Sequence, residues 1–228
     1  MLLMKKFILS LILLIALVAC GSNEVNLEDL AEIANTPEPT NLTDTFTGES
    51  ETNGDVLTLY GQVLDLAGTP LPDMTVEIWQ TDAVGVYDHP DDPSTSNRDQ
   101  TFQFYGATQT DSDGWYAFRT IIPGEYEPRP RHIHFKVKDG DKTELTSQFY
   151  FTDDVADVQD EGMFRAAGES GNLLLLQLVQ GDDTILANGR IVLGIGDGNL
   201  PETPSQGEGP YYPVVNLADF DNDLVTLP

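Results

Sequence analysis

The sequence predicts an all-β sandwich with long irregular loops and one short helix. Short segments in which apolar and polar residues alternate are separated by turn signals rich in Gly, Asp and Pro. Only residues 153–168 have a helical pattern. Hydrophobic residues make up 40% of the 228 residues, so the chain can bury the core of one globular domain with tails.

The expected strands follow one another through the body of the chain, and a long irregular excursion at 82–106 interrupts them. Successive side chains of a strand point to opposite faces, so alternation gives each strand one face for the core. The Asp-Gly pair at 139–140 indicates a hairpin. The expected strands are LTLYGQVLDL (57–66), MTVEIWQTD (74–82), WYAFRTI (115–121), HIHFKVKDGDK (132–142), LTSQFYF (145–151) and two strands in LLLLQLVQGDDTILANGRIVLGIG (173–196).

The N-terminus has the pattern of an export signal. Two lysines precede an apolar run from Phe7 to Ala19 that is too short to span a bilayer comfortably. The run ends in LVAC, which looks like a bacterial lipobox. We therefore expect a lipoprotein signal peptide over residues 1–19 and lipid on Cys20, the only cysteine of the chain. A plain signal peptide with an incidental cysteine is the alternative.

Residues 20–54 are expected to form a lipid-anchored acidic tether, which leaves the β domain at 55–228. The tether is rich in Glu, Asp, Asn, Thr and Pro, and its few apolar residues show no sustained period. We expect the domain to lie in the bacterial cell envelope, outside the cytoplasm, with lipid as the membrane contact. The formal net charge of −27 argues against nucleic-acid binding.

The stretch RPRHIHFKV at 129–137 contains two of the three histidines of the chain. His132 and His134 alternate in an expected strand, so they project from the same face. Each neutral imidazole has a donor and an acceptor that need partners, which suits a metal site better than a plain core. Two hydrogen-bonded or surface histidines are the alternative. The third histidine, His89, lies in the excursion.

A metal held by these histidines needs further ligands, and the only cysteine is expected to carry lipid. Tyrosine is a candidate, because Tyr87 lies in the excursion and Tyr126 lies six residues before His132. Phenolates are hard anionic ligands, and two of them favour a ferric ion. Taken alone, each tyrosine is more often a core or rim aromatic, so the ligand set stays open at this point.

The segments VEIWQTDAVGVYDH, TDSDGWYAFRTIIPGEY, RPRHIHFKV and TSQFYF closely resemble the intradiol ring-cleavage dioxygenases. The resemblance covers about residues 56–196 and the C-terminal segment. It implies the prealbumin-like β-sandwich of that family and one non-haem Fe(III) as cofactor. The iron ligands implied by position are Tyr87, Tyr126, His132 and His134.

The activity implied by the resemblance is Fe(III)-dependent intradiol cleavage of a catecholic aromatic by O2 to a cis,cis-muconate-type product. Tyr126 is implied as both ligand and base. Arg129 matches the arginine that steadies charge developing on the ring, and Gln148 matches a glutamine beside the ligands. The expected partners are the small catechol and O2, and a homo-oligomer stays open because the family is commonly oligomeric.

The order of segments departs from the family pattern. The family usually begins with a stretch like TPSQTEGPYY, whereas PETPSQGEGPYYPV occurs here at 201–214, after the expected sandwich. We infer a circular permutation, and we expect residues 201–228 to pack back beside the strand that starts near Val56. The residues then expected at the pocket border are Gly209, Pro210, Tyr211 and Tyr212. A disordered tail and a segment swapped onto a neighbouring copy are the alternatives.

A second function class competes with the dioxygenase. LYGQVLDLAGTPLPDMTVEIWQ and TDSDGWYAFRTIIPGEY also resemble transthyretin-like and carboxypeptidase-regulatory-like modules, which are non-catalytic β-sandwiches on cell surfaces. The histidine pair and the two tyrosines separate the two predictions, because a binding module has no need for them. A dioxygenase-like domain that binds iron without turnover is an intermediate possibility.

Overall fold

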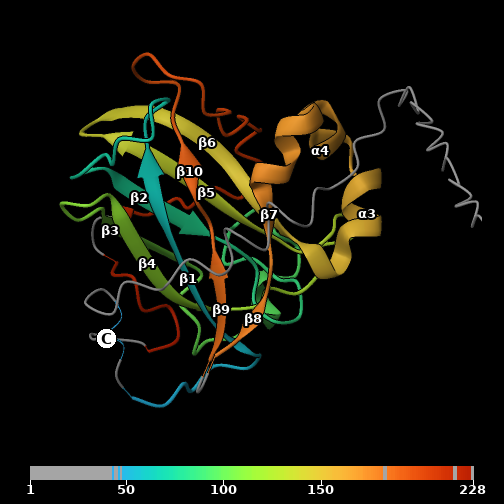
Figure 1. Ribbon diagram of the computed structural model, residues 1–228. Helices are drawn as coiled ribbons and strands as arrows, with labels where there is room; N and C mark the ends of the chain where they lie inside the picture. Colours follow the sequence, from blue (N-terminus) through green and yellow to red (C-terminus); the bar gives the residue numbers. More distant parts are fainter. Residues whose placement is uncertain (1–42, 44–45, 47, 182–183, 218–219, 227–228) are drawn as a thin grey trace, which may run out of the picture.

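The computed structural model describes residues 43, 46, 48–181, 184–217 and 220–226 (Figure 1). The predicted signal peptide, the predicted lipid attachment at Cys20 and most of the predicted tether lie outside the described residues. Within the described ranges, no helix has both the length and the apolar character needed to cross a bilayer.

Ten strands form two packed sheets in the described part of the chain. In the first sheet, β1 pairs with β4 along one edge and with β9 and β10 along the other. It consists of β10 (Ile191–Val192), β1 (Val56–Leu64), β9 (Ile185–Asn188), β8 (Val179–Gln180) and β4 (Trp115–Ile121). The second sheet has the order β3 (Tyr105–Gln109), β2 (Thr75–Trp79), β5 (His132–Asp139), β6 (Lys142–Phe151) and β7 (Leu175–Leu176).

The helical stretch expected at 153–168 consists of two short α-helices, which lie beside β7 at one edge of the sandwich (Figure 1). Glu161 separates them because its backbone is extended, and its side chain accepts a hydrogen bond from the Phe164 amide at the start of the second helix. The helical elements are η1 (Thr95–Asn97), η2 (Thr152–Asp154), α3 (Val155–Asp160), α4 (Gly162–Ala166) and η3 (Gly168–Leu174).

The segment expected to form two strands at 173–196 instead forms four short ones. β9 and β10 both run parallel to β1, and each pairs with a different end of it. Gly189 lies between them, where a Cβ atom would be 2.8 Å from the Phe149 ring. The close packing of this glycine on the core explains why the strand is interrupted there.

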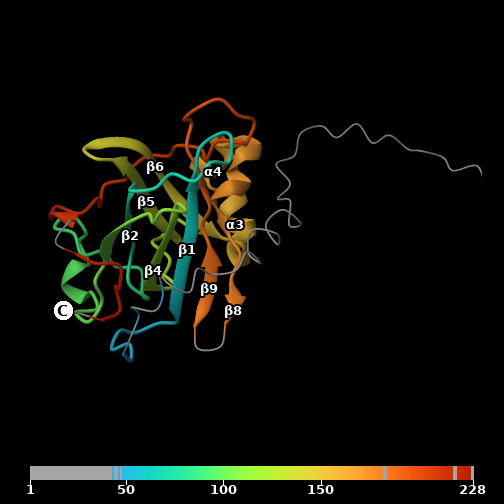
Figure 2. The same cartoon turned by 60° about the vertical axis from the view of Figure 1, so that its left-hand side comes forward.

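The apolar core lies between the two layers that Figure 2 shows from the side. On the second sheet, Ile133, Phe135 and Val137 of β5 point into this core, and the ring of Phe135 stacks on Phe149 with centroids 4.3 Å apart. On the first sheet, Leu59 of β1 also belongs to the core. Alternation along the strands therefore produces the buried inner faces that the sequence predicts.

The outer face of the second sheet is also buried, but it is polar. The side chains that share it are Glu77, Trp79, His132, His134, Lys136, Gln148 and Tyr150. Two irregular segments contact this face. They are the excursion between β2 and β3, which reaches His132 through Tyr87, and the C-terminal segment, which reaches Tyr150 through Gln206. This covered polar face is where the candidate site forms.

The excursion predicted at 82–106 is irregular until β3 begins at Tyr105, and it contains only η1. Asp82 is fully buried and organises its start. Its carboxylate accepts hydrogen bonds from the backbone amides of Val84, Val86 and Asp99 at 2.9–3.0 Å. A buried carboxylate needs such donors, and here they fix the loop that carries Tyr87.

The C-terminal segment packs back on the sandwich, with Leu224 and Val225 fully buried. Its neighbours differ from the prediction. Residues 221–225 bond to β4 through Arg119 and to β3 through Ala107, so they do not lie beside β1. The reason is that both edges of β1 are already paired, which leaves the gap between β4 and β3 for this segment.

The domain makes contacts earlier in the chain than the predicted boundary at residue 55. Arg119 donates to the Gly48 carbonyl, and Thr101 donates to the Glu51 carbonyl. Asp99 accepts hydrogen bonds from the backbone and side chain of Asn53. Residues 48–54 of the predicted tether therefore bind the surface of the β domain.

Candidate metal centre

The two histidines at the start of β5 lie side by side on the outer face of the second sheet. His132 and His134 are 4% and 3% exposed, and their ring centroids are 4.8 Å apart. The Nδ1 atom of His132 bonds to the Pro130 carbonyl at 2.7 Å. A nitrogen that donates to a carbonyl carries the ring proton, so Nε2 of His132 keeps its lone pair for the site.

His134 is held between Trp79 and the C-terminal segment. Its ring stacks on Trp79 with centroids 4.8 Å apart and planes within 5°. On its other side, a Cβ atom added to Gly209 would be 3.3 Å from Cε1 of His134. Gly209 also has a φ of +77°, which favours glycine. The prediction that Gly209 borders the site thus has a structural reason.

Two loops bring Tyr87 to the histidines and Tyr126 to Tyr87. The Tyr87 hydroxyl lies 3.3 Å from Nε2 of His132, and the two tyrosine rings are 5.7 Å apart between centroids. The loops touch at Gly85, where a Cβ atom would be 2.0 Å from the Glu125 carbonyl oxygen. The excursion and the β4–β5 loop therefore have to pack together for the four predicted ligand residues to converge.

Burial determines the protonation of this cluster. It lowers the pKa of His132 to about 3, helped by the nearby Arg129 guanidinium, and it lowers the pKa of His134 well below the usual value. Both imidazoles are therefore neutral near pH 7 and can donate lone pairs. Burial raises the pKa of Tyr87, so ionised Tyr87 requires a cation beside it.

Arg129 and Gln148 lie next to the four residues. Arg129 places one guanidinium nitrogen 3.2 Å from Nε2 of His132 and another 3.4 Å from the Tyr150 hydroxyl. Gln148 is fully buried beside His134 and donates to the same Tyr150 hydroxyl. Tyr150 was not singled out from the sequence, although it follows Gln148 by two residues in a strand and so shares its face.

The C-terminal segment contributes Tyr211 to the centre. Its hydroxyl lies 2.7 Å from the Tyr126 hydroxyl, and its ring lies 4.8 Å from the Tyr87 ring. The hydrogen bond with Tyr126, together with burial, raises the pKa of Tyr211 to about 12. The buried His89, with its ring centroid 5.5 Å away, supports the same ring.

The remaining two residues predicted at the pocket border are Pro210 and Tyr212. Pro210 is exposed. The Tyr212 hydroxyl donates to Glu77 at 2.9 Å, and the Tyr212 ring packs on Trp79. Tyr212 therefore fastens the segment to the sheet, whereas Tyr211 lines the centre.

The donor set fits a trivalent, oxygen-preferring metal ion. The four residues offer two phenol oxygens and two imidazole nitrogens, and across the described residues no group of three or more His, Cys, Asp and Glu could hold a metal ion. Neighbouring ligand atoms at about 2.0–2.1 Å from one first-row ion lie roughly 3 Å apart. The separation of 3.3 Å between the Tyr87 oxygen and Nε2 of His132 is close to that value.

The family model described as Dioxygenase matches residues 30–168, which is more than half of the chain. The chain belongs to the intradiol ring-cleavage dioxygenase family. This family generally uses non-haem Fe(III). Membership favours the dioxygenase prediction over the non-catalytic transthyretin-like module.

Individual relatives are similar over part of their length. The protocatechuate 3,4-dioxygenase beta chain of Burkholderia cepacia is 37% identical over 121 residues, which cover 50% of this chain and 52% of that protein. The catechol 1,2-dioxygenase of Acinetobacter baylyi is 33% identical over 138 residues, covering 50% of this chain and 43% of that protein. The chain thus spans about half the length of the curated intradiol dioxygenases that it matches.

Among solved structures, the chain is similar to the dioxygenase domain of a dioxygenase–carbohydrate-binding protein fusion from the cellulolytic bacterium Streptomyces sp. SirexAA-E. The TM-score is 0.50 at 29% sequence identity, and the match covers 65% of this chain and 86% of that domain. The likeness supports the sandwich fold expected for an intradiol dioxygenase.

Proposed function

We propose that this chain cleaves a catecholic aromatic with O2 by the intradiol route, giving a cis,cis-muconate-type product. The ligands of the required Fe(III) would be Tyr87, Tyr126, His132 and His134. One observation carries the proposal: two tyrosines from separate loops converge on a neutral histidine pair in a buried polar face, within a chain of the intradiol dioxygenase family.

A ferric ion held by these four residues would supply Lewis acidity toward the catechol. The chain supplies proton transfer around it. As an ionised ligand of the metal, Tyr126 would take a catechol proton at its phenolate oxygen and become a neutral phenol, and the Tyr211 hydroxyl at 2.7 Å would hold that phenol by a hydrogen bond. Tyr126 suits this role because it is half-buried, whereas Tyr87 is 3% exposed.

The chain also supplies fixed charge. The guanidinium of Arg129 lies beside Nε2 of His132, where it faces negative charge that spreads over a bound ring. Gln148 fixes the Tyr150 hydroxyl, which in turn contacts Arg129. These groups are held by hydrogen bonds within the chain itself, which reduces the reorganisation needed in the transition state.

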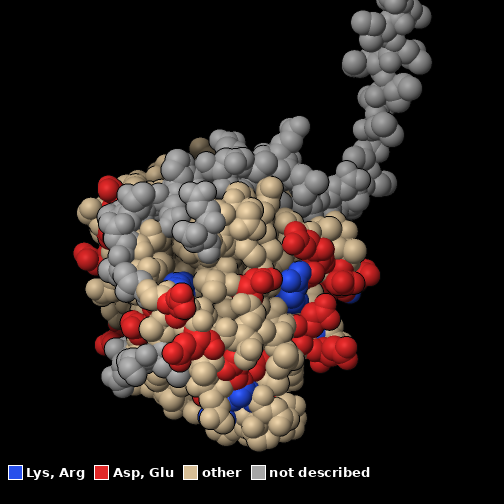
Figure 3. Space-filling view, turned by 90° about the horizontal axis from the view of Figure 1, so that it is seen from below, with Lys and Arg blue, Asp and Glu red and all other residues tan. Residues whose placement is uncertain are grey.

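We further propose that the preferred catechol carries no carboxylate. Two arginines near the centre could have bound one, but Arg129 pairs with Glu161 at 3.2 Å and Arg131 pairs with Asp154 at 2.6 and 2.7 Å. Acidic side chains are also numerous on the face of the molecule that Figure 3 shows. An anionic substituent would meet repulsion there.

The test of the main proposal is made on the protein without residues 1–20, by measuring iron content, the visible spectrum, O2 uptake and product absorbance with catechol. We expect one iron per chain, with a tyrosinate-to-Fe(III) absorption band that shifts when catechol binds, and an intradiol product. A protein that stays colourless and metal-free after reconstitution with iron would contradict the proposal.

Anchoring and segment order are separate proposals that rest on the sequence. We propose that Cys20 carries lipid and holds the domain in a bacterial cell envelope; labelling with radioactive palmitate, lost in Cys20→Ala, tests this.

We also propose that residues 201–228 are a circularly permuted family segment. A chain in which 201–226 is moved ahead of Gly48 is then expected to fold and bind iron, and failure to fold would oppose the permutation.

A further inference from the structure

The turn between α3 and α4 carries a nearly buried carboxylate close to the metal centre. The Glu161 side chain is 11% exposed and has three partners. One oxygen accepts from the Phe164 amide at 2.8 Å and from the Tyr150 hydroxyl at 3.2 Å, and the other accepts from Arg129 at 3.2 Å. The contacts with Phe164 and Tyr150 fix the carboxylate, so it can hold the Arg129 guanidinium in one position.

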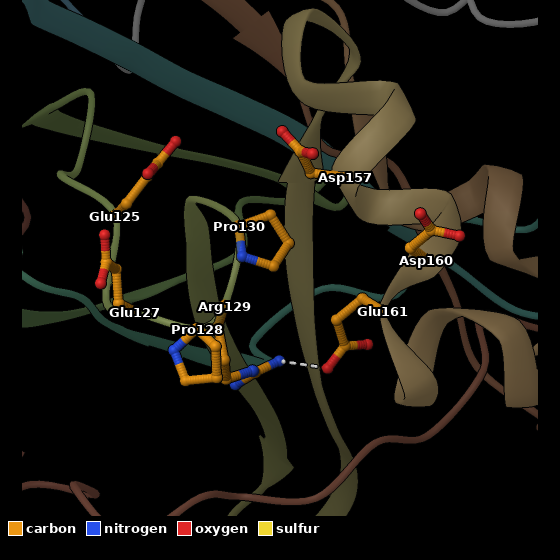
Figure 4. A pocket seen from close by; sticks show the side chains of 8 residues that line it. All are labelled: Glu125, Glu127, Pro128, Arg129, Pro130, Asp157, Asp160 and Glu161. Atoms are coloured by element: carbon orange, nitrogen blue, oxygen red, sulfur yellow. Dashed lines mark hydrogen bonds and ion pairs between the residues drawn. The ribbon is translucent and has the colours of Figure 1, made fainter.

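Arg129 and Glu161, joined by a dashed line in Figure 4, are part of the lining of a pocket of about 440 Å³. Asp157 and Asp160 come from α3, and Glu125 and Glu127 lie across from them on the β4–β5 loop. Among the described residues, Glu161 is the only one of these carboxylates in an ion pair with Arg129. The direction of the guanidinium therefore depends on Glu161 more than on the acidic surroundings.

Arg129 needs such support, because arginine has a long side chain with many rotamers. Its inner nitrogen, Nε, is buried and has no hydrogen-bond partner in the described structure. The remaining contacts of the guanidinium are to His132 and to the Tyr150 hydroxyl. Among the described residues, no other carboxylate forms an ion pair with Arg129 that could hold the guanidinium toward the centre.

Tyr150 extends the support to the C-terminal segment. Its hydroxyl lies 3.1 Å from the Gln206 side chain and also contacts Gln148, Glu161 and Arg129. The position of Arg129 is thereby tied to three separate parts of the chain, namely the α3–α4 turn, β6 and the C-terminal segment.

We propose that Glu161 is a positioning residue for the dioxygenase reaction. It fixes the Arg129 guanidinium beside His132, in the place from which the guanidinium can stabilise charge on a bound catechol. This inference rests on the proposed function, but it concerns a residue that no motif of the sequence marks.

The chain offers a matched control two residues farther along. Arg131 and Asp154 form a second ion pair between the start of β5 and the helical region, at 2.6 and 2.7 Å. Arg131 lies over the Phe151 ring at 5.6 Å. Asp154→Asn therefore weakens a comparable junction without touching Arg129.

The experiment compares the full chain as wild type, Glu161→Gln, Glu161→Asp and Asp154→Asn. Glutamine can still accept from the Phe164 amide, so α4 keeps its cap while the charge is lost. The first measurement is kcat and KM for catechol with iron loaded. The second is NMR of the arginine side chains in the metal-free protein, where slow guanidinium rotation reports a fixed Arg129.

We expect Glu161→Gln to lower kcat/KM at least tenfold while iron content and the visible band stay as in wild type, and to free the rotation of Arg129. Glu161→Asp should give an intermediate loss, and Asp154→Asn should stay within twofold of wild type. Wild-type kcat/KM in Glu161→Gln, or an equal loss in Asp154→Asn, would overturn the proposal.

A wild-type protein that binds iron but does not cleave catechol would refute the proposed function instead. The NMR comparison still decides the positioning role in that case. Slow rotation of the Arg129 guanidinium in Glu161→Gln would overturn the positioning role. Faster rotation in Glu161→Gln, but not in Asp154→Asn, would support it. If Glu161→Gln does not fold, Glu161→Asp replaces it, because its shorter side chain draws the carboxylate away from the guanidinium; wild-type kcat/KM and slow Arg129 rotation in Glu161→Asp would then overturn the proposal.

Discussion

The two faces of β5 are equally buried but are made of opposite kinds of residue. Ile133, Phe135 and Val137 point into the core between the sheets, whereas His132 and His134 point outward and are covered by irregular segments. Apolar burial needs no partners, but each buried imidazole needs a hydrogen bond or a metal. Burial alone therefore does not distinguish core from site; the polarity of a buried face does.

The strongest test of this comparison removes the ring of His134 from the outer face. His134→Ala is expected to lose bound iron and at least about 10²-fold in catechol turnover, since removing even a group behind a metal ligand costs 10–100-fold. The free energy of unfolding of the metal-free protein should change less than in the neighbouring core variant described next. Iron analysis and turnover check this, and full activity would remove His134 from the centre.

The matched change on the inner face is Phe135→Ala. Phe135 is fully buried and stacks on Phe149, so its truncation is expected to lower the free energy of unfolding by about 3–5 kcal/mol. Molecules that remain folded should still bind iron. Urea unfolding together with iron analysis separates the two faces. Loss of iron from folded Phe135→Ala would show that the faces are not independent.

Substrates of different charge test whether the arginines near the outer site are free to bind a carboxylate. With Arg129 and Arg131 both paired to carboxylates, kcat/KM for protocatechuate is expected to be about tenfold or more below that for catechol, which equals roughly 1.4 kcal/mol of lost stabilisation. Parallel assays at several salt concentrations measure this. Equal values at low salt would mean that an arginine is free to bind the carboxylate.

The cover of the outer face is tested at Gly209. Gly209→Ala places a Cβ atom 3.3 Å from the His134 ring in a residue with φ of +77°. We expect a loss of about 1–2 kcal/mol in stability from the left-handed backbone and a few-fold rise in KM for catechol. Steady-state kinetics and thermal unfolding check this, and an unchanged KM would place Gly209 outside the pocket border.

The smallest effect concerns Asp99, which joins the excursion to Asn53 at the start of the domain. Burial alone would raise the pKa of Asp99, but hydrogen bonds from Thr101 and Asn53 outweigh it and hold the pKa well below the usual range. The ionised form is therefore the stabilising one: its contribution is present above about pH 4 and is lost as the pH falls through the folded pKa. We therefore measure the free energy of unfolding between pH 2 and 7. As the pH is lowered, it should fall less steeply in Asp99→Ala than in wild type.

Local pattern was sufficient to predict part of the site. Alternation places His132 and His134 on one face, and the hairpin at 139–140 pairs His134 with Gln148. The same rule could have added Tyr150 to the set. The sandwich and its long excursion also follow from strand pattern and turn residues.

Other features depend on how distant segments close on one another, and the sequence pattern does not determine this. Glu161 looks like one more acid in a helical stretch, yet an extended backbone breaks the helix there and turns its side chain to Arg129. The C-terminal segment was expected beside β1, but strand pairing fills both edges of β1 and leaves the gap between β3 and β4.

The hydrogen bond between Tyr126 and Tyr211 also has a consequence for the order of assembly. Ribosomes make Tyr211 after every candidate ligand, so a growing chain carries all four ligands before it has the wall that packs against them. Gly209 reaches His134 equally late. Final assembly of the centre therefore comes after all four ligands have been made, and a metal that arrives earlier would meet an open site.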